Sequence, residues 1–248
     1  MTPGLSVDLE EVSDIHKTAV ISNRLGRLRM DIITLQETRL SSFGSIRNKD
    51  FSFFWQEKLP DEIREHGVGF AIRSSLICSI VSPTEGTERL LKFQLQTLAG
   101  LVSCISAYAP SLASSPEAKD KFFDKLSAAI SEVPLQEPLF IFGDFNARDG
   151  ASNSSWSSCL GQFGMGKMKK KGQHLLELCH HGLCITKHWH QFDLILTRCS
   201  RLDSVKLTCS HQSADCNTDH SLMCSKVNLQ SRRFHYSKMG DHTSTQVR

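Results

Sequence analysis

The stretch LFIFGDFNAR, residues 139–148, decides how the rest of the chain is interpreted. Its first four residues form an apolar run, which is typical of a buried strand. The run ends in Gly-Asp-x-Asn, so Asp144 and Asn146 lie two residues apart on one side of the chain as it leaves the sheet. A carboxylate and a carboxamide at the end of a buried strand predict a catalytic or metal-binding site at the edge of a sheet.

Other acidic residues follow apolar runs elsewhere in the sequence. The segment ITLQET carries Glu37, the segment TDHSL carries Asp219 and His220, and the segment FDLIL carries Asp193. Each has an ordinary explanation when taken alone: a solvated strand-end charge, a surface histidine, or, for Asp-x-Asn, a local turn. Because chance rarely places all of them at strand ends in one chain, their joint occurrence favours a shared site.

These residue types suit the hydrolysis of a phosphodiester bond, which needs charge stabilisation and an aligned water molecule. Glu37 is a candidate ligand for Mg²⁺, which takes only one or two protein carboxylates. Asp144 can orient and deprotonate the water, and Asn146 can hold the water or a phosphate oxygen. His220 can donate to the phosphate, and Asp193 is an attractive partner for its ring because an unpaired buried acid is costly.

Composition indicates a globular protein. The 248 residues are 40% hydrophobic and 22% charged, with a formal net charge of +3. That charge permits a nucleic-acid partner without demanding one. The sequence has no apolar run long enough to span a membrane and no basic start with an apolar core at its beginning. We therefore expect a nuclear or cytoplasmic protein that is not secreted and does not bind a membrane.

The nine cysteines are scattered, without a CxxC pair. Cys78, Cys104 and Cys184 lie in apolar runs, where a thiol behaves as a small buried hydrophobe. We expect all nine to be reduced. Zinc is a weaker alternative, because the spacings within two crowded stretches match no known finger. Those stretches contain Cys179, His181, Cys184, His188 and His190, and Cys209, His211, Cys216 and His220.

The hydrophobic pattern predicts one α/β domain over residues 14–230, in which sheets pack together with helices outside. Residues 1–13 are expected to be irregular and residues 231–248 to form a disordered polar tail. Helices are predicted over residues 14–29, from Ser115 to about Val133, and around residues 175–179. Strands are predicted over residues 31–36, 51–55, 67–73, 91–95, 101–108, 139–144, 183–186, 192–197, 204–209 and 221–227.

Five strings of the sequence occur in an order known from one superfamily. They are DIITLQETRL, HGVGFAIRSSL, ISAYAP, LFIFGDFNARDG and TDHSLM. In these strings the chain resembles the endonuclease/exonuclease/phosphatase superfamily, and within it the retrotransposon-derived (LINE-type) endonuclease domains and the craniofacial development protein 2-like proteins. The resemblance implies a DNase I-like fold, a four-layered α/β sandwich of two facing mixed β-sheets flanked by helices.

The resemblance also implies a metal site and a water site. Glu37 is then a ligand of Mg²⁺ or Mn²⁺, and Asp219 lies beside the metal or the leaving group. Asp144 and Asn146 handle the attacking water.

On the substrate side, the resemblance implies that Tyr108 approaches the phosphate and that Asp193 orients His220 for catalysis. Arg148, Asn146 and Tyr108 are the implied substrate-binding residues. From the residues alone, Tyr108 would be an aromatic strand-end residue of the core.

Two departures from the family pattern are visible. Family members open with a strand that ends in Asn, and nothing in residues 1–13 matches it, so a central strand loses a neighbour. Relatives also carry a longer segment after Thr186, so part of one hairpin is missing here. A register slip of one residue in this shortened hairpin would turn Asp193 to the wrong face.

Three functions remain open from the sequence. The first is a metal-dependent endonuclease that hydrolyses DNA, with RNA as a second possible substrate and no obligate protein partner evident. The second is a catalytically inactive relic or a repurposed nucleic-acid- or protein-binding domain. The third is a phosphatase of the same superfamily.

Overall fold

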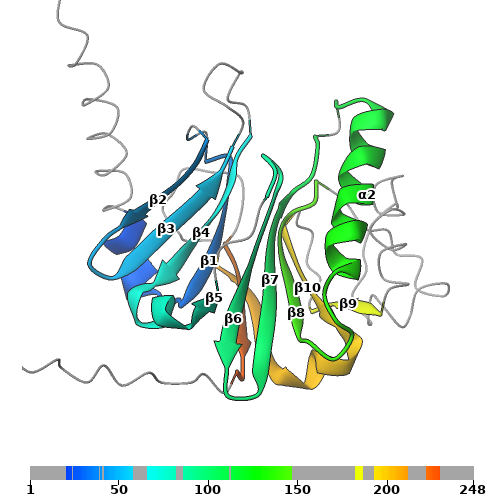
Figure 1. Ribbon diagram of the computed structural model, residues 1–248. Coiled ribbons are helices and arrows are strands. Elements are labelled where there is room, and N and C mark those ends of the chain that lie inside the picture. Colours follow the sequence, from blue (N-terminus) through cyan, green and yellow to red (C-terminus); the bar gives the residue numbers. More distant parts are fainter. Residues whose placement is uncertain are drawn as a thin grey trace, which may run out of the picture.

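The computed structural model describes the chain over residues 21–23, 25–38, 40, 42–57, 66–81, 86–111, 113–146, 182–186, 193–211 and 222–229. Two sheets pack face to face, and a long helix covers the outer face of the larger sheet (Figure 1). This is the sandwich that the sequence predicts.

The smaller sheet is antiparallel throughout. Its strands, in spatial order, are β1 (Ile32–Gln36), β4 (Val68–Arg73), β3 (Phe51–Gln56) and β2 (Phe43–Arg47). A short 3₁₀ helix, η1 (Ser74–Ser79), follows β4 and leads into the larger sheet.

The larger sheet has six strands and is mixed. In spatial order they are β5 (Ile80–Val81), β6 (Leu90–Thr97), β7 (Gly100–Tyr108), β8 (Leu139–Asp144), β10 (Asp193–Arg198) and β9 (Leu183–Ile185). Among the described strands of this sheet, only β7 and β8 form a parallel pair. A parallel pair needs a crossover connection, which here contains α2 (Pro116–Ser131). After β10, η2 (Cys199–Ser204) leads into a separate hairpin of β11 (Val205–His211) and β12 (Leu222–Val227).

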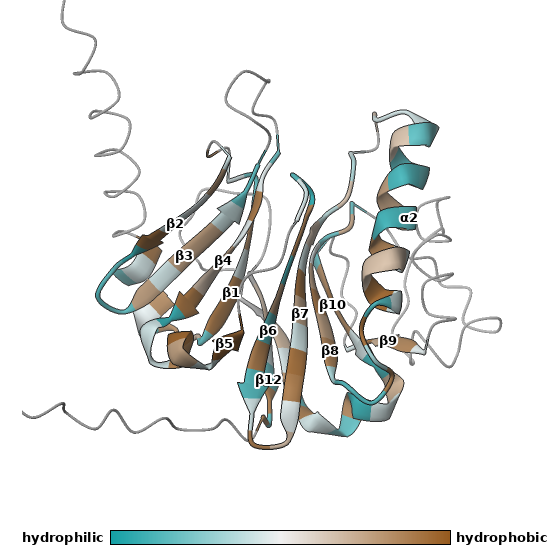
Figure 2. Cartoon of the chain, viewed as in Figure 1, coloured by the Kyte–Doolittle hydropathy of each residue, from teal (hydrophilic) through white to brown (hydrophobic). Residues whose placement is uncertain are grey.

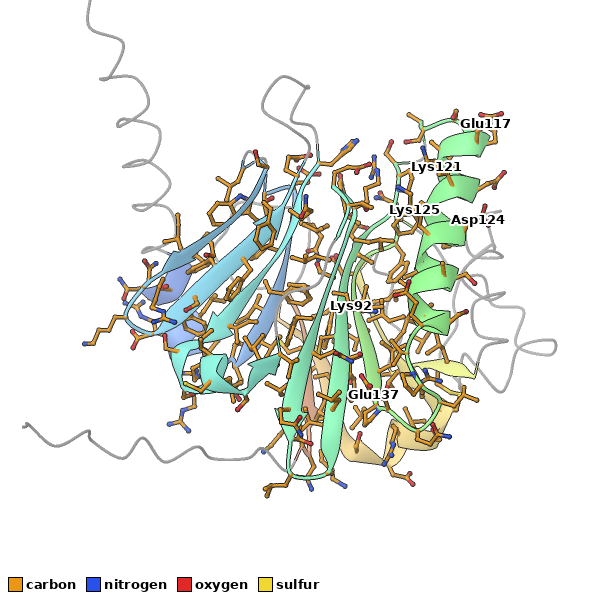
Figure 3. All side chains as sticks on the ribbon, in the orientation of Figure 1. Lys92, Glu117, Lys121, Asp124, Lys125 and Glu137 are labelled. Carbon is orange, nitrogen blue, oxygen red and sulfur yellow. A yellow bond between two sulfur atoms is a disulfide. The ribbon has the colours of Figure 1, made fainter. Side chains whose placement is uncertain are left out.

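Helix α2 begins where the sequence places it. The Ser115 side chain caps the helix by accepting from the backbone N–H of Ala118 at 3.2 Å, and Pro116 occupies the first turn. One face buries Phe122, Leu126 and their neighbours against the outer face of the larger sheet. The opposite face is charged: Glu117, Lys121, Asp124 and Lys125 are exposed (Figure 3). No helix in the described part of the chain has the length and apolar character needed to cross a bilayer.

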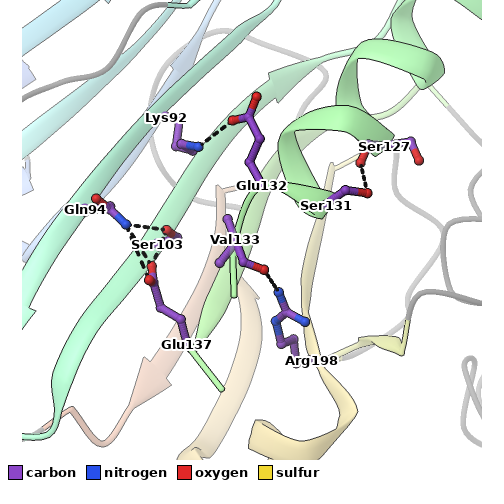
Figure 4. A network of polar contacts seen from close by, with 9 residues as sticks. All are labelled: Lys92, Gln94, Ser103, Ser127, Ser131, Glu132, Val133, Glu137 and Arg198. Carbon is purple, nitrogen blue, oxygen red and sulfur yellow. Dashed lines mark hydrogen bonds and ion pairs between the residues drawn. The ribbon is translucent and has the colours of Figure 1, made fainter. Parts of the chain in front are cut away.

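The connection between α2 and β8 is fixed by polar contacts (Figure 4). Glu137 accepts hydrogen bonds from Ser103 and from Gln94, both on the outer face of the larger sheet. The guanidinium of Arg198, at the end of β10, donates to the carbonyl of Val133 at 2.7 Å. These bonds hold β8 and β10 in a defined position under the helix.

The core between the sheets follows from strand alternation. Alternate residues of β4, β6, β7 and β8 point inward and are almost fully buried, and the strands that meet there are mainly apolar (Figure 2). Phe70 of β4 packs edge-to-face on Phe93 of β6, with ring centroids 4.6 Å apart. The buried members are Val68, Phe70, Ile72, Leu91, Phe93, Leu95, Val102, Cys104 and Phe140.

The strand predictions are confirmed to within a few residues, but β2 and β5 were not predicted. The β2 sequence FGSIR contains a glycine and presents Phe43 at 51% exposure, so it lacks a buried apolar face. Two-residue β5 is too short to leave a pattern. Of the helix predicted over residues 14–29, residues 21–23 and 25–27 are described and helical. Residues 1–13, the helix near 175–179 and the tail 231–248 lie outside the described residues.

Strand β1 forms one edge of the smaller sheet, since within the described ranges it pairs only with β4. Near its end, Gln36 Nε2 and Thr38 Oγ1 are buried and have no hydrogen-bond partner among the residues that the structure describes. Buried polar atoms are normally satisfied, so these two indicate a polar environment that is incomplete without a water molecule or a ligand.

The structure corrects the expectation for the cysteines. Cys184 and Cys199 form a disulfide, so reduction of all nine is wrong for this pair. Thr197 lies opposite Cys184, and Cys199 follows two residues later, which brings the two Cα atoms to 5.2 Å, a separation that a disulfide spans. Cys78 is also not buried: it lies in η1 with an exposed side chain. Cys104 is buried, as predicted.

Alkylation rates should distinguish the exposed Cys78 from the buried Cys104. We expect iodoacetamide at pH 8 to label Cys78 quickly and Cys104 only after unfolding. Burial raises the pKa of the Cys104 thiol to about 12, so the reactive thiolate is scarce and inaccessible. Peptide mass spectrometry of a labelling time course measures both rates. Comparable labelling of the two residues in the folded protein would contradict the buried position of Cys104.

Candidate active site

Several strand ends meet at one edge of the sandwich. The register places Asp144, the last residue of β8, beside Tyr108 of the parallel β7 and opposite Asp193 of the antiparallel β10. Residues in register share a face of a sheet, and this face points toward the smaller sheet, because Phe140 of β8 lies in the inter-sheet core on the same side. Glu37 follows β1 of the facing sheet.

A hydrogen bond joins the two sheets at this edge. The Tyr108 hydroxyl donates to Glu37 Oε1 at 2.7 Å. Burial raises the pKa of Tyr108 to about 12, and the Glu37 hydrogen bond and the charges of Glu37 and Asp144 act in the same direction. The phenol is therefore protonated at neutral pH and remains a donor. The Arg89 guanidinium lowers the pKa of Tyr108, against the two carboxylates, so charges of both signs surround this phenol.

Asp144 and Asn146 form a compact turn after β8. Asp144 is 5% exposed, and its Oδ1 accepts from the backbone N–H of Asn146 at 2.7 Å. The Asn146 amide donates to the carbonyl of Ala109 at 3.1 Å and to Asp144 Oδ2 at 3.3 Å. The turn interpretation of Asp-x-Asn is thus correct, and it does not compete with a chemical role, because the same bonds hold the Asp144 carboxylate in place. In this conformation the Asn146 amide hydrogens point to protein acceptors.

Two of the four described non-glycine residues with positive φ are candidate site residues, and the other two are Arg29 and Ser42. Glu37 has φ of 52° and Asn146 has φ of 48°, in the left-handed region that non-glycine residues seldom occupy. Such a conformation costs about 1–3 kcal/mol in general, less for Asn, and persists where the surroundings impose it. Strained residues of this kind concentrate at active sites, so their position here supports a functional edge.

Two basic residues beside Tyr108 were not singled out from the sequence. Arg89 precedes β6, and its Nη1 donates to the carbonyl of Tyr108 at 3.1 Å, with the guanidinium 5.4 Å from the centre of the Tyr108 ring. Its Nη2 lies 2.8 Å from Nε2 of His66, which therefore accepts, since a guanidinium only donates. The signal that could have found them is their position: Arg89 immediately precedes β6 and His66 lies two residues before β4, and both strands start at this edge.

The structure leaves part of the predicted site untested. Asp219, His220 and Arg148 lie outside the described residues, so their roles stay predictions. Asp193 is described, and the shortened hairpin does not turn it away: it is on the same face as Asp144. Whether it orients His220 also stays a prediction.

The residues present are compatible with a divalent cation. Within the ranges that the structure describes, no three His, Cys, Asp or Glu side chains come together as a metal-binding group. Mg²⁺ needs only one or two carboxylates and keeps water and phosphate as its other ligands. Glu37 provides one carboxylate, and Thr38 Oγ1, which is unsatisfied among the described residues, is next to it in sequence. The zinc alternative loses Cys184, which is in a disulfide.

The chain is similar to known proteins over most of its length. The model of the Endonuclease/Exonuclease/phosphatase family matches residues 10–242. Craniofacial development protein 2 of Bos taurus is 24% identical over 233 residues, which cover 86% of this chain and 39% of that protein. The chain thus spans about two fifths of the length of this curated relative.

Two solved structures share the fold. The 3′ phosphatase NExo (D146N) from Neisseria, bound to a product DNA hairpin, has a TM-score of 0.60 at 16% identity and covers 86% of this chain and 94% of its own. The endonuclease domain of TRAS1, a telomere-specific non-LTR retrotransposon, has a TM-score of 0.60 at 13% identity and covers 86% and 93%. Together with the family match, which extends over most of the sequence, these findings show that the chain belongs to the endonuclease/exonuclease/phosphatase family.

Proposed function

We propose that the chain is a metal-dependent endonuclease that hydrolyses DNA phosphodiester bonds. The observation that carries the proposal is the meeting of Glu37, Tyr108, Asp144 and Asp193 at one edge of the sandwich, with Arg89 beside them. Membership of the family supports hydrolysis of a phosphate ester, and the NExo structure supports DNA as the substrate class.

The charges at this edge are arranged for a phosphate that is bound together with a cation. Glu37, Asp144 and Asp193 make one side acidic, whereas Arg89, whose guanidinium donates to His66, makes the other side basic, with Tyr108 between them. An anion alone would be repelled by the acidic side, and a cation alone would be repelled by Arg89. A phosphodiester with a divalent cation satisfies both sides.

Each side chain then has a role in the reaction. Asp144 takes the proton from the attacking water, and Asn146 holds the Asp144 carboxylate in position. Tyr108 and Arg148 contact the phosphate, while His220, oriented by Asp193, donates to it. Glu37 and Asp219 are the carboxylates that would hold Mg²⁺ or Mn²⁺. When bound, such an ion stabilises charge on the phosphate and lowers the pKa of a coordinated water.

Cleavage of a labelled duplex tests the proposal against its alternatives. The substrate is a DNA duplex with a fluorophore at one 5′ end and a phosphate at the 3′ end, incubated with Mg²⁺ or with EDTA. Internal cleavage that needs Mg²⁺ supports the endonuclease. Release of the terminal phosphate alone indicates a phosphatase, and no product from a folded protein indicates an inactive or binding domain. Glu37→Gln, purified identically, should cleave nothing and controls for contaminating nucleases.

Arg89→Gln should weaken DNA binding equally for duplexes of different sequence. If Arg89 neutralises one backbone phosphate, the slope of log affinity against log salt should become shallower by about one. Fluorescence anisotropy in EDTA measures both quantities without cleavage. Lys206→Gln is the matched control, because Lys206 is exposed and is the second residue of β11, beyond the far end of β10. Equal slopes for Arg89→Gln and the unmodified protein would contradict a phosphate contact.

A further inference from the structure

The disulfide lies at the opposite end of the strand that carries Asp193. It connects Cys184, in the middle of β9, with Cys199, the first residue after β10, over a sequence separation of 15. All of β10 lies inside the loop that this bond closes. The disulfide therefore constrains the whole strand from its far end to Asp193.

The backbone ladder that joins β9 to the sheet is short. Among the described strands β9 is an edge strand, and its register with β10 comprises three pairs, from Leu183–Arg198 to Ile185–Leu196. Backbone bonds continue at each end, from Cys199 N–H to Gly182 O at 2.8 Å and from Thr186 N–H to Ile195 O at 3.0 Å. Burial of Leu183 and Ile185 in the core favours this register, and the disulfide adds a covalent constraint to it.

The two cysteines differ in exposure in a way that suits reversible chemistry. Cys184 is 5% exposed and packed in the sheet, whereas Cys199 is an exposed residue. Reduction begins when an external thiolate attacks one of the two sulfur atoms, so exposure of one cysteine favours it.

We propose that the Cys184–Cys199 disulfide is a reversible redox switch that holds β9 on β10 and thereby fixes the position of Asp193 opposite Asp144. A dithiol reduces it: the S–S bond breaks, two electrons and two protons convert Cys184 and Cys199 to thiols, and the dithiol becomes a cyclic disulfide. Glutathione disulfide reverses the step by accepting two electrons and leaving as two thiols. Reduction removes the covalent link between β9 and β10 and thereby loosens β10, whose other paired strand among the described residues is β8.

The structural consequence is tested without any assay of activity. Non-reducing peptide mapping should find the Cys184–Cys199 bond in protein oxidised with glutathione disulfide. On reduction, we expect the melting temperature to fall by roughly 6–12 °C, as removal of a 15-residue loop constraint predicts for a domain of this size. Hydrogen exchange should accelerate in residues 183–185 and 193–198 and stay unchanged in β3 and β4. Absence of the bond, or exchange that does not respond to reduction, would overturn the proposal.

Matched variants separate the bond from other effects of the reagent. Cys199→Ser, at an exposed position, should behave like the reduced protein and lose its response to dithiothreitol. Cys78→Ser, also exposed but not bonded, should keep the full response.

The effect on activity rests on the proposed endonuclease function. Reduction should lower the cleavage rate about tenfold or more through misplacement of Asp193, in the unmodified protein but not in Cys199→Ser. If hydrogen exchange responds to reduction but no condition gives cleavage, the endonuclease proposal fails, and the structural role of the Cys184–Cys199 disulfide stands. If cleavage occurs at the same rate in both redox states, the switch fails and the endonuclease stands.

Discussion

Asp144→Asn should reduce Mg²⁺-dependent DNA cleavage by about 10²–10⁴-fold, the range that a general base usually contributes. The substitution keeps the size and shape of the side chain and an oxygen that can accept the backbone N–H of Asn146, but it removes the charge that takes up the proton. Initial rates of duplex cleavage at equal protein and Mg²⁺ concentrations measure the loss.

The buried position of Asp144 requires a check on folding. The new amide group would face the amide of Asn146, which now donates to Asp144 Oδ2, so one bond is lost. We expect a modest decrease in melting temperature with unchanged circular dichroism. Asp203→Asn, an exposed carboxylate in η2, makes the same chemical change away from the site and should leave the rate unchanged. A rate above half that of the unmodified protein would exclude Asp144 as the base.

Gly143→Ala should destabilise the fold by about 3 kcal/mol or more, the upper part of the range for inserting atoms into packed interiors. A Cβ atom at this position would lie 1.9 Å from the carbonyl oxygen of Ala107 in the neighbouring strand. The obstacle is backbone in a central strand, which cannot rotate away. Because Gly143 precedes Asp144, any shift of β8 that relieves the clash also displaces the carboxylate.

Urea unfolding followed by tryptophan fluorescence gives the free energy of unfolding for this variant. Gly26→Ala is the matched control: it lies in a helical segment, and an added Cβ there would meet nothing within 4 Å. That substitution should stabilise the protein by about 0.5–1 kcal/mol. If Gly143→Ala is as stable as Gly26→Ala, the close approach of β7 and β8 is not present in solution.

The sequence predicts the site strands because each has a strong local signal. The run before Asp144 is continuously apolar, as expected for a central strand buried on both faces, and α2 carries a serine cap, an early proline and a helical apolar stripe. Such features need no knowledge of distant residues, and the structure agrees with them closely. Tyr108, by contrast, is assigned to the site through family resemblance. Its local sequence does not distinguish a catalytic aromatic residue at a strand end from one that belongs to the core.

What the sequence does not predict depends on register between distant segments. The Cys184–Cys199 bond exists because β9 and β10 pair with Thr197 opposite Cys184, which cysteine spacing alone does not reveal. The contact of Arg89 with Tyr108 depends likewise on the ends of β6 and β7 meeting. The edge strand β2 lacks a buried apolar face, so its pairing with β3 decides its conformation.

The most direct test of the central claim is the nicking of supercoiled plasmid by the purified protein in Mg²⁺ and in EDTA. Nicked circles that accumulate in Mg²⁺ and are absent in EDTA are the predicted result, since one internal phosphodiester cleavage relaxes the plasmid. A protein that is folded by circular dichroism and leaves the plasmid supercoiled under both conditions would contradict the endonuclease proposal and favour a binding or inactive domain.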